Sequence, residues 1–221
     1  MTVDMSRLKV FKIFRPVSWI AIFCTAIPTL GLEPNLSSPQ AALKSLNQAV
    51  ESQDGAAVLK VFYTSTAEER DLAQAFSDLI LAAKKLSEAE KTNYGVAGVP
   101  PATGVMSVDE LSHLDRADLK ITGDTATLLP IGRSRAIQFH RSQERWQLVI
   151  RDFANAEDNL PRQVSILKKV TQVFETVSGD IASGKFTSSQ EAEAAIQTKL
   201  AAVMIKAATQ ATSQPATKPS R

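Results

Sequence analysis

The chain has 221 residues but only one cysteine and two histidines. The cysteine, Cys24, lies in an apolar stretch near the N-terminus, so the rest of the chain has no cysteine. This excludes disulfides, thiol nucleophiles and cysteine-ligated metals from that part. The Gly-x-Ser-x-Gly motif of serine hydrolases is absent, and the glycines of the loop 95–104 lack the lysine and the spacing of a phosphate-binding loop. The sequence therefore predicts neither a cofactor nor a metal site.

Neither sign of charge dominates, since the chain has 25 lysines and arginines and 23 acidic residues. Residues 1–31 hold four of the basic residues and one of the acidic ones, which leaves 21 basic and 22 acidic residues in the remainder. A nearly neutral chain has no strong electrostatic attraction to nucleic acid or to an anionic membrane. We therefore predict no nucleic-acid partner.

Long hydrophobic runs are also missing, apart from the stretch 17–27. This stretch follows a basic cluster and has about eleven residues, whereas a membrane span needs roughly twenty. The pattern predicts a signal peptide over residues 1–31, with cleavage between about Ala26 and Gly31. The expected location is then the periplasm or the medium. The alternative is an uncleaved leader that anchors the protein, which limits membrane contact to the leader.

Helical patterns follow a predicted linker over residues 32–38. Ser38-Pro39 is a helix start, with Ser as N-cap and Pro in the first turn, and the apolar stripe after it ends at Asp54-Gly55. A second short helix is predicted over 56–63. Thr66 and Glu69 form a capping box that begins a longer helix over 67–91. We place Glu90 at the solvated end of that helix.

Alternating apolar and polar residues predict strands after these helices. They cover 118–121, 126–131, 135–141 and 145–153, and turns at Gly123-Asp124 and 142–144 separate two pairs of them. An antiparallel sheet of about four strands follows, with one apolar face for helices to cover.

The last part of the chain is again helical in pattern. An apolar stripe predicts a helix over 162–181, Gly184 breaks it, and Ser188 with Glu191 caps a final helix. The stripe is expected to pack on the helix 67–91. The predicted fold class is α+β, with N-terminal helices, the sheet, a C-terminal helical extension over 159–208 and a disordered tail over 209–221.

The order of elements resembles the NTF2-like (cystatin-like) α+β superfamily over about residues 39–153. The segment from Leu46 to Leu59, in which a helix ends at Asp-Gly and a second one follows, is similar to the opening of such domains. The closing strand Arg145-Trp-Gln-Leu148 is similar to their returning strand. The resemblance implies a domain over 39–158 that forms a cone around a pocket. Some members are isomerases or dehydratases with an Asp or His in the pocket, and many only bind ligands or partners.

His140 and Asp152 are the candidate catalytic residues. His140 follows Phe139 in an alternating strand, so it points to the face opposite the apolar one. If that face lines a pocket, His140 is a general base with Asp152 as its partner. If the face is solvated, His140 is a surface residue. Asp152 also begins an acidic cluster with Glu157 and Asp158, but its spacing matches no calcium loop.

Three functions remain open from the sequence. The favoured one is an exported, non-enzymatic domain that binds a small apolar ligand or a partner protein. The second is a pocket enzyme of the isomerase or dehydratase type that uses His140 and Asp152. The third is a structural envelope protein that assembles through its C-terminal helices.

Overall fold

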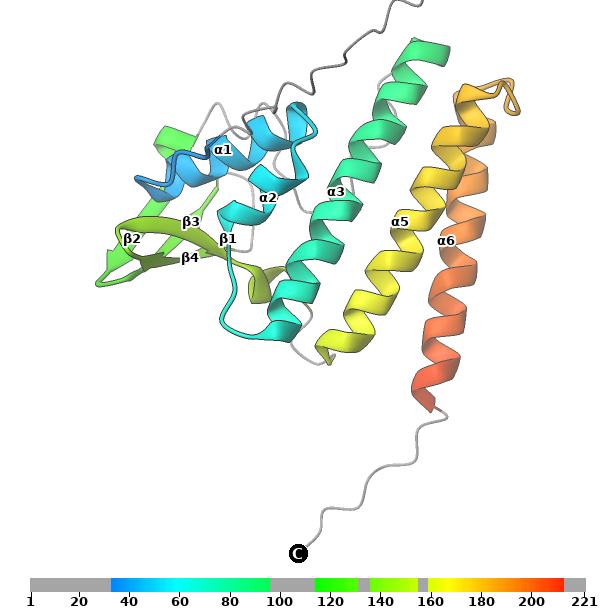
Figure 1. Cartoon of the computed structure of the whole chain (residues 1–221). Coiled ribbons are helices and arrows are strands. Elements are labelled where there is room, and N and C mark those ends of the chain that lie inside the picture. The colour runs from blue at the N-terminus through cyan, green and yellow to red at the C-terminus, as the bar shows by residue number, and fades with distance from the viewer. Residues whose placement is uncertain (1–32, 96–113, 131–135, 155–158, 213–221) are drawn as a thin grey trace, which may run out of the picture. The chain divides into compact units, whose positions relative to one another are not determined.

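The computed structural model of the chain describes residues 33–95, 114–130, 136–154 and 159–212. These residues confirm the α+β class, with N-terminal helices, a sheet and two C-terminal helices (Figure 1). The predicted leader, the acidic residues Glu157 and Asp158 and the end of the predicted tail lie outside the described residues.

The first helix begins at its predicted N-cap, Ser38, and the second begins at Gly55, one residue before its predicted start at 56. In α1 (Pro39–Glu51) the Ser38 side chain accepts a hydrogen bond from the Ala41 N–H, and in α2 (Gly55–Val61) the Asp54 side chain does the same for Ala57. The segment before α1, predicted as a linker, packs on the sheet. Leu36 is only 4% exposed, and its carbonyl accepts a hydrogen bond of 2.7 Å from the Trp146 N–H.

The sheet has five strands in the order β1-β5-β4-β3-β2, so it has one strand more than predicted. Strands β2 to β5 are antiparallel neighbours, and β1 pairs with β5 in parallel. The strands are β1 (Phe62–Tyr63), β2 (Asp118–Thr122), β3 (Thr125–Leu129), β4 (Ile137–Ser142) and β5 (Arg145–Val149).

Two predicted boundaries at the sheet are wrong. The helix predicted over 56–63 ends at Val61, because Phe62 and Tyr63 are held as β1 by the distant strand β5. The strand predicted over 145–153 ends at Val149, and the 3-10 helix η2 (Ile150–Phe153) follows it. Both differences come from tertiary contacts that a local pattern does not encode.

A first hydrophobic core lies between the inner face of the sheet and the helices α1, α2 and α3 (Ala67–Tyr94). Three aromatic rings fill the space where α3 meets the sheet. The Phe62 ring packs edge-on against Phe76 and Phe153, with centroid distances of 5.7 and 5.8 Å. Pairs of this geometry are stabilising beyond the area that they bury.

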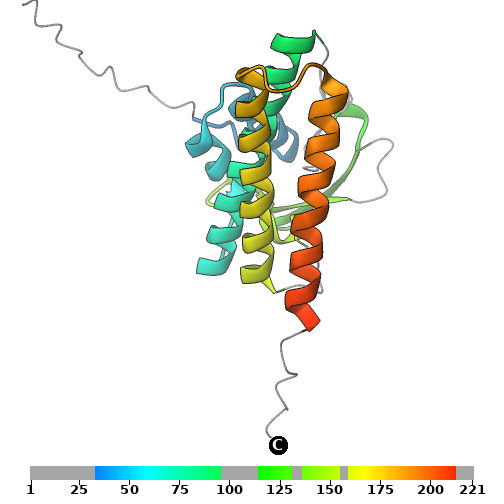
Figure 2. The same cartoon turned by 90° about the vertical axis from the view of Figure 1, so that its right-hand side faces the viewer.

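A second core lies between α3, α5 (Leu160–Ala182) and α6 (Ser189–Thr212). Helix α5 runs beside α3 in the same direction, and α6 returns along α5 (Figures 1 and 2). The apolar stripe of α5 thus packs on α3 of the same chain, as predicted. The buried residues of this core are Leu79, Ala82, Ala83, Leu86, Val173, Phe174, Val177, Ile181, Ala192 and Ile196.

The final helix is longer and less buried than α5. It extends to Thr212, four residues beyond the predicted end of the helical extension. Among its described side chains Ala192 and Ile196 are buried, whereas Met204 and Ile205 are 57% and 67% exposed.

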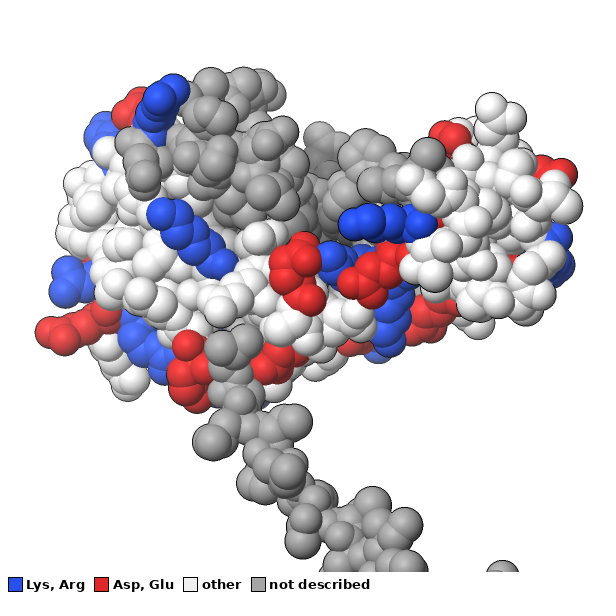
Figure 3. Space-filling view, turned by 90° about the horizontal axis from the view of Figure 1, so that it is seen from above, with Lys and Arg blue, Asp and Glu red and all other residues white. Residues whose placement is uncertain are grey.

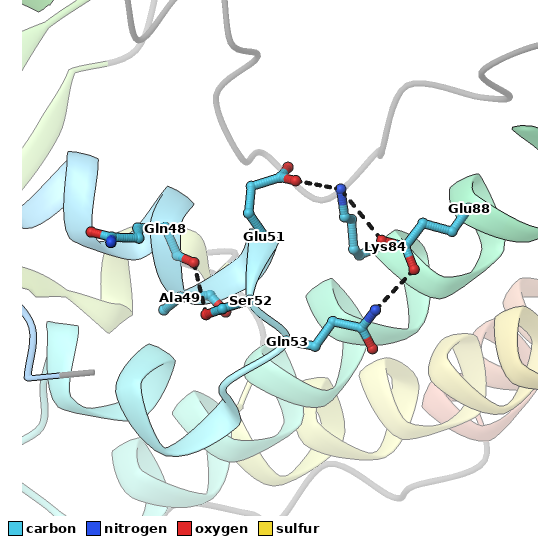
Figure 4. A network of polar contacts seen from close by, with 7 residues as sticks. All are labelled: Gln48, Ala49, Glu51, Ser52, Gln53, Lys84 and Glu88. Atoms are coloured by element: carbon cyan, nitrogen blue, oxygen red, sulfur yellow. Dashed lines mark hydrogen bonds and ion pairs between the residues drawn. The ribbon is translucent and has the colours of Figure 1, made fainter. Parts of the chain in front are cut away.

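A polar network fixes the turn between α1 and α2 against α3 (Figure 4). The Lys84 ammonium lies 2.6 Å from the Glu51 carboxylate and 3.6 Å from that of Glu88. The Gln53 amide donates a 2.8 Å hydrogen bond to Glu88. The hydrogen bond to Glu51 is the main reason why the pKa of Lys84 is raised. Helix α3 is therefore held from two sides, by this network and by α5.

Candidate functional site

His140 lies on β4, on the face of the sheet opposite the first core, as predicted. It is half-buried, and its ring centroid is 4.1 Å from that of Tyr63 on β1. The cross-strand partner of His140 is Gln147 on β5, whose side-chain amide donates hydrogen bonds to the carbonyls of Lys60 and Phe62. These contacts hold the two-residue strand β1 on the sheet, so this part of the outer face has a clear structural role.

Asp152 lies in η2 rather than on the strand where the sequence placed it. Its carboxylate accepts a 3.0 Å hydrogen bond from the Gln138 N–H on β4. The structure thus shows a ring contact for His140 on the outer face and a backbone hydrogen bond from β4 for Asp152.

Glu69 is a buried carboxylate near the same 3-10 helix. It accepts hydrogen bonds from the Ser65 N–H at 2.6 Å, the Ser65 hydroxyl at 2.8 Å and the Arg151 guanidinium at 2.8 Å. Burial raises the pKa of Glu69, but the hydrogen bonds from Ser65 and Arg151 outweigh burial, and the pKa is lowered overall. Glu69 is therefore an ionised group that links the start of α3 to η2.

A groove of about 510 Å³ lies between α3 and α5, and it opens to solvent. Among the residues that line it, Ala82 and Thr171 are buried and Leu81 is half-buried. The exposed residues of its walls are Asp78 and Lys85 on α3 and Lys168, Gln172 and Glu175 on α5. We call this site the α3–α5 groove.

The charges of the α3–α5 groove alternate in sign. Asp78 and Lys85 are two helical turns apart on one wall, and Lys168 and Glu175 are two turns apart on the other. Because the helices run in the same direction, the order of signs along one wall is the reverse of that along the other. No hydrogen bond or ion pair joins any of these four side chains to another, and Asp78 accepts only from Gln74 on its own helix.

Other surface features point to no second chemistry within the described residues. Lys and Arg side chains alternate with Asp and Glu side chains over the face in Figure 3, and neither sign forms a large patch there. Over the described ranges, no helix is long and apolar enough to cross a bilayer. The same ranges contain no cluster of three His, Cys, Asp or Glu side chains suited to a metal ion.

Glu90, predicted at the solvated end of α3, is 2% exposed. Burial raises the pKa of Glu90, and the nearby Glu193 carboxylate on α6 raises it further. The same end of α3 is fixed by Tyr94, whose hydroxyl donates a 3.2 Å hydrogen bond to the Phe186 carbonyl between α5 and α6. The prediction for Glu90 failed because the burial comes from tertiary packing rather than from the helix itself.

Glu90→Gln is expected to stabilise the protein at neutral pH by about 1 kcal/mol. A carboxyl whose folded-state pKa is raised stabilises the fold below its unfolded pKa, and that stability is lost as the pH rises through the folded pKa. The gain in stability from the variant should therefore disappear near pH 4.

Thermal unfolding between pH 4 and pH 7 measures this gain, and Glu69→Gln is the contrasting variant. Since the pKa of Glu69 is lowered, that variant should lose stability at neutral pH, and the loss should shrink as the medium is acidified. If Glu90→Gln destabilises the protein at pH 7, the claim that burial disfavours the ionised Glu90 carboxylate is contradicted.

The chain matches no protein family, no curated protein and no solved structure. Function therefore has to be argued from the geometry of the chain itself, and membership of the NTF2-like superfamily stays a proposal.

Proposed function

We propose that this chain is an exported, non-enzymatic domain that binds a partner protein in the α3–α5 groove. The observation that carries the proposal is a solvent-open groove whose four charged side chains do not pair with one another. Charged side chains that form no ion pair among the described residues can form one with an incoming chain. The groove's volume of about 510 Å³ limits what enters it to a short segment of the partner.

The chemistry of the groove indicates what the partner presents. Each wall carries one basic and one acidic side chain, so a segment with charges of both signs is complementary to it. Such complementarity favours specificity and the association rate. Leu81 and Ala82 add a small apolar surface for one of the partner's side chains. The partner is therefore expected to insert a short segment of mixed charge.

A small apolar ligand and a catalytic pocket are less well supported. In an NTF2-like domain, a bound apolar ligand or a substrate would lie between the sheet and the helices. In this chain the rings of Phe62, Phe76 and Phe153 pack against one another in that region. His140 packs on Tyr63 of β1, and Asp152 accepts a hydrogen bond from the backbone of β4. We therefore prefer a partner protein to either alternative.

Site-specific photo-crosslinking in the cells that produce the protein tests this proposal. A benzophenone side chain replaces Gln172 in the groove or, as the control, Gln197 on the exposed surface of α6. We expect a discrete adduct with one protein from position 172 and none from position 197. Reversing both groove lysines, as Lys85→Glu with Lys168→Glu, should reduce the adduct about tenfold.

Two results contradict the proposed function. One is an equal set of adducts from positions 172 and 197, which indicates random collision. The other is an adduct from position 172 that is unchanged by the lysine reversals, which shows that the charges of the groove are not used. Unchanged thermal unfolding of each variant confirms that the fold is intact.

A second candidate function is assembly through the C-terminal helices. It is favoured by the exposed side chains of Met204 and Ile205 on α6. Ile205→Lys places a charge in that surface and should abolish any assembly through it. The variant also serves as a control in the experiment below.

A further inference from the structure

Strand β2 forms an edge of the sheet, and among the described residues only β3 pairs with it. Its five residues pair with β3 without interruption, so no bulge protects the edge. Ile121 lies opposite the buried Ala126 yet is 53% exposed. Regular edge strands with exposed apolar side chains are templates for pairing with another strand.

The register of the β2–β3 hairpin shows which backbone groups point outward. Thr122 and Thr125 flank the two-residue turn Gly123-Asp124, and the pair next to such a turn exchanges backbone hydrogen bonds with each other. Hydrogen-bonded pairs alternate along antiparallel strands. The N–H and C=O groups of Leu119 and Ile121 therefore point away from β3, toward the open edge.

The side chains of β2 are complementary to a second copy of the same strand. If two copies pair antiparallel with Leu119 opposite Leu119, Asp118 lies opposite the second copy's Lys120, and the symmetry repeats this contact. Leu119 then exchanges both backbone hydrogen bonds with its counterpart. Asp118 and Lys120 fall in the closer, non-hydrogen-bonded positions, where cross-strand ion pairs form best. Ile121 then lies opposite Ala117, the residue that precedes β2 in the second copy.

We propose that two copies of this chain associate through β2 in this register and so continue the sheet from one copy into the next. The outward-pointing backbone groups allow symmetric registers centred on Leu119, Lys120 or Ile121, and only the first of these pairs Asp118 with Lys120. A register centred on Lys120 places two lysines opposite each other, which is unfavourable. The proposal concerns a different surface from the α3–α5 groove, so either can fail without the other.

Charge reversal with rescue tests the proposed contact. Sedimentation velocity over a concentration series is measured on the full chain in the form that an exporting host delivers. Asp118→Lys alone and Lys120→Asp alone each place like charges opposite each other twice. We expect each single variant to weaken dimerisation about tenfold.

The double variant restores opposite charges, and its dimerisation should return to within about threefold of the original. Glu144→Lys, in the β4–β5 turn rather than on β2, makes the same change in net charge as Asp118→Lys and should leave dimerisation unchanged.

Three results overturn the proposal. The first is an original chain that stays monomeric at every concentration. The second is a double variant that is no better than the two single ones. The third is loss of the dimer in Ile205→Lys while the β2 variants dimerise normally, which places the contact on α6. Unchanged thermal unfolding of the single variants excludes unfolding as the cause.

Discussion

Replacing Trp146 by alanine is expected to lower the free energy of unfolding by about 3–5 kcal/mol. Trp146 is 6% exposed and shares the inner face of β5 with the fully buried Leu148. Its removal leaves a cavity between the sheet and the helices, close to the segment whose Leu36 carbonyl accepts from the Trp146 N–H. Chemical denaturation of the variant and the original protein measures the loss.

Arg145→Ala is the matched control, because Arg145 is the exposed neighbour of Trp146 on the same strand. It should change the free energy of unfolding by less than about 0.5 kcal/mol. A loss below about 1 kcal/mol for Trp146→Ala contradicts the assignment of the inner face.

Ending the chain after Asp158 is expected to abolish stable folding. The truncation removes α5 and α6, and α5 alone contributes four large buried side chains to the second core. Each such side chain contributes about 1.5–3 kcal/mol, so the loss of roughly 6–12 kcal/mol approaches the whole stability of a typical domain. It also exposes the apolar face of α3, which should cause aggregation. The four side chains are Val173, Phe174, Val177 and Ile181.

Ending the chain after Gly184 provides the comparison, because it removes α6 and keeps α5. The described buried residues of α6 are Ala192 and Ile196, so this chain should fold and lose about 2–4 kcal/mol. Size-exclusion chromatography and thermal unfolding distinguish the two truncations. If the chain that ends at Asp158 is soluble and unfolds in a cooperative thermal transition, α3 does not need the second core in order to fold, and the account is contradicted.

Local chemistry in the sequence predicts much of this fold. The predicted caps Ser38 and Thr66 mark helix starts because each side chain satisfies a backbone N–H that the helix leaves open. The turns predicted at 123–124 and 142–144 similarly mark the two hairpins, and the structure narrows the second turn to 143–144. At the second turn Gln143 and Glu144 both have positive φ, as the favoured two-residue hairpin turn requires.

Features that depend on contacts between residues far apart in the sequence cannot be predicted from the local pattern of apolar and polar residues. Strand β1 has only two residues and exists because β5 pairs with it. Glu90 follows a polar pattern yet is buried at the end of α3 close to α6. The α3–α5 groove combines exposed side chains from helices about ninety residues apart, and each of them is ordinary on its own helix.

Lysine labelling tests the central claim, that a partner protein occupies the α3–α5 groove, most directly. An amine-reactive reagent is applied to the producing cells and to the purified protein, and the labelled positions are compared by mass spectrometry. Lys85 and Lys168 line the groove and are exposed, whereas Lys199 on α6 is exposed and lies outside it. The account predicts that Lys85 and Lys168 are protected in cells and labelled in the purified protein, while Lys199 is labelled equally in both. Equal labelling of all three lysines in the two samples would contradict it.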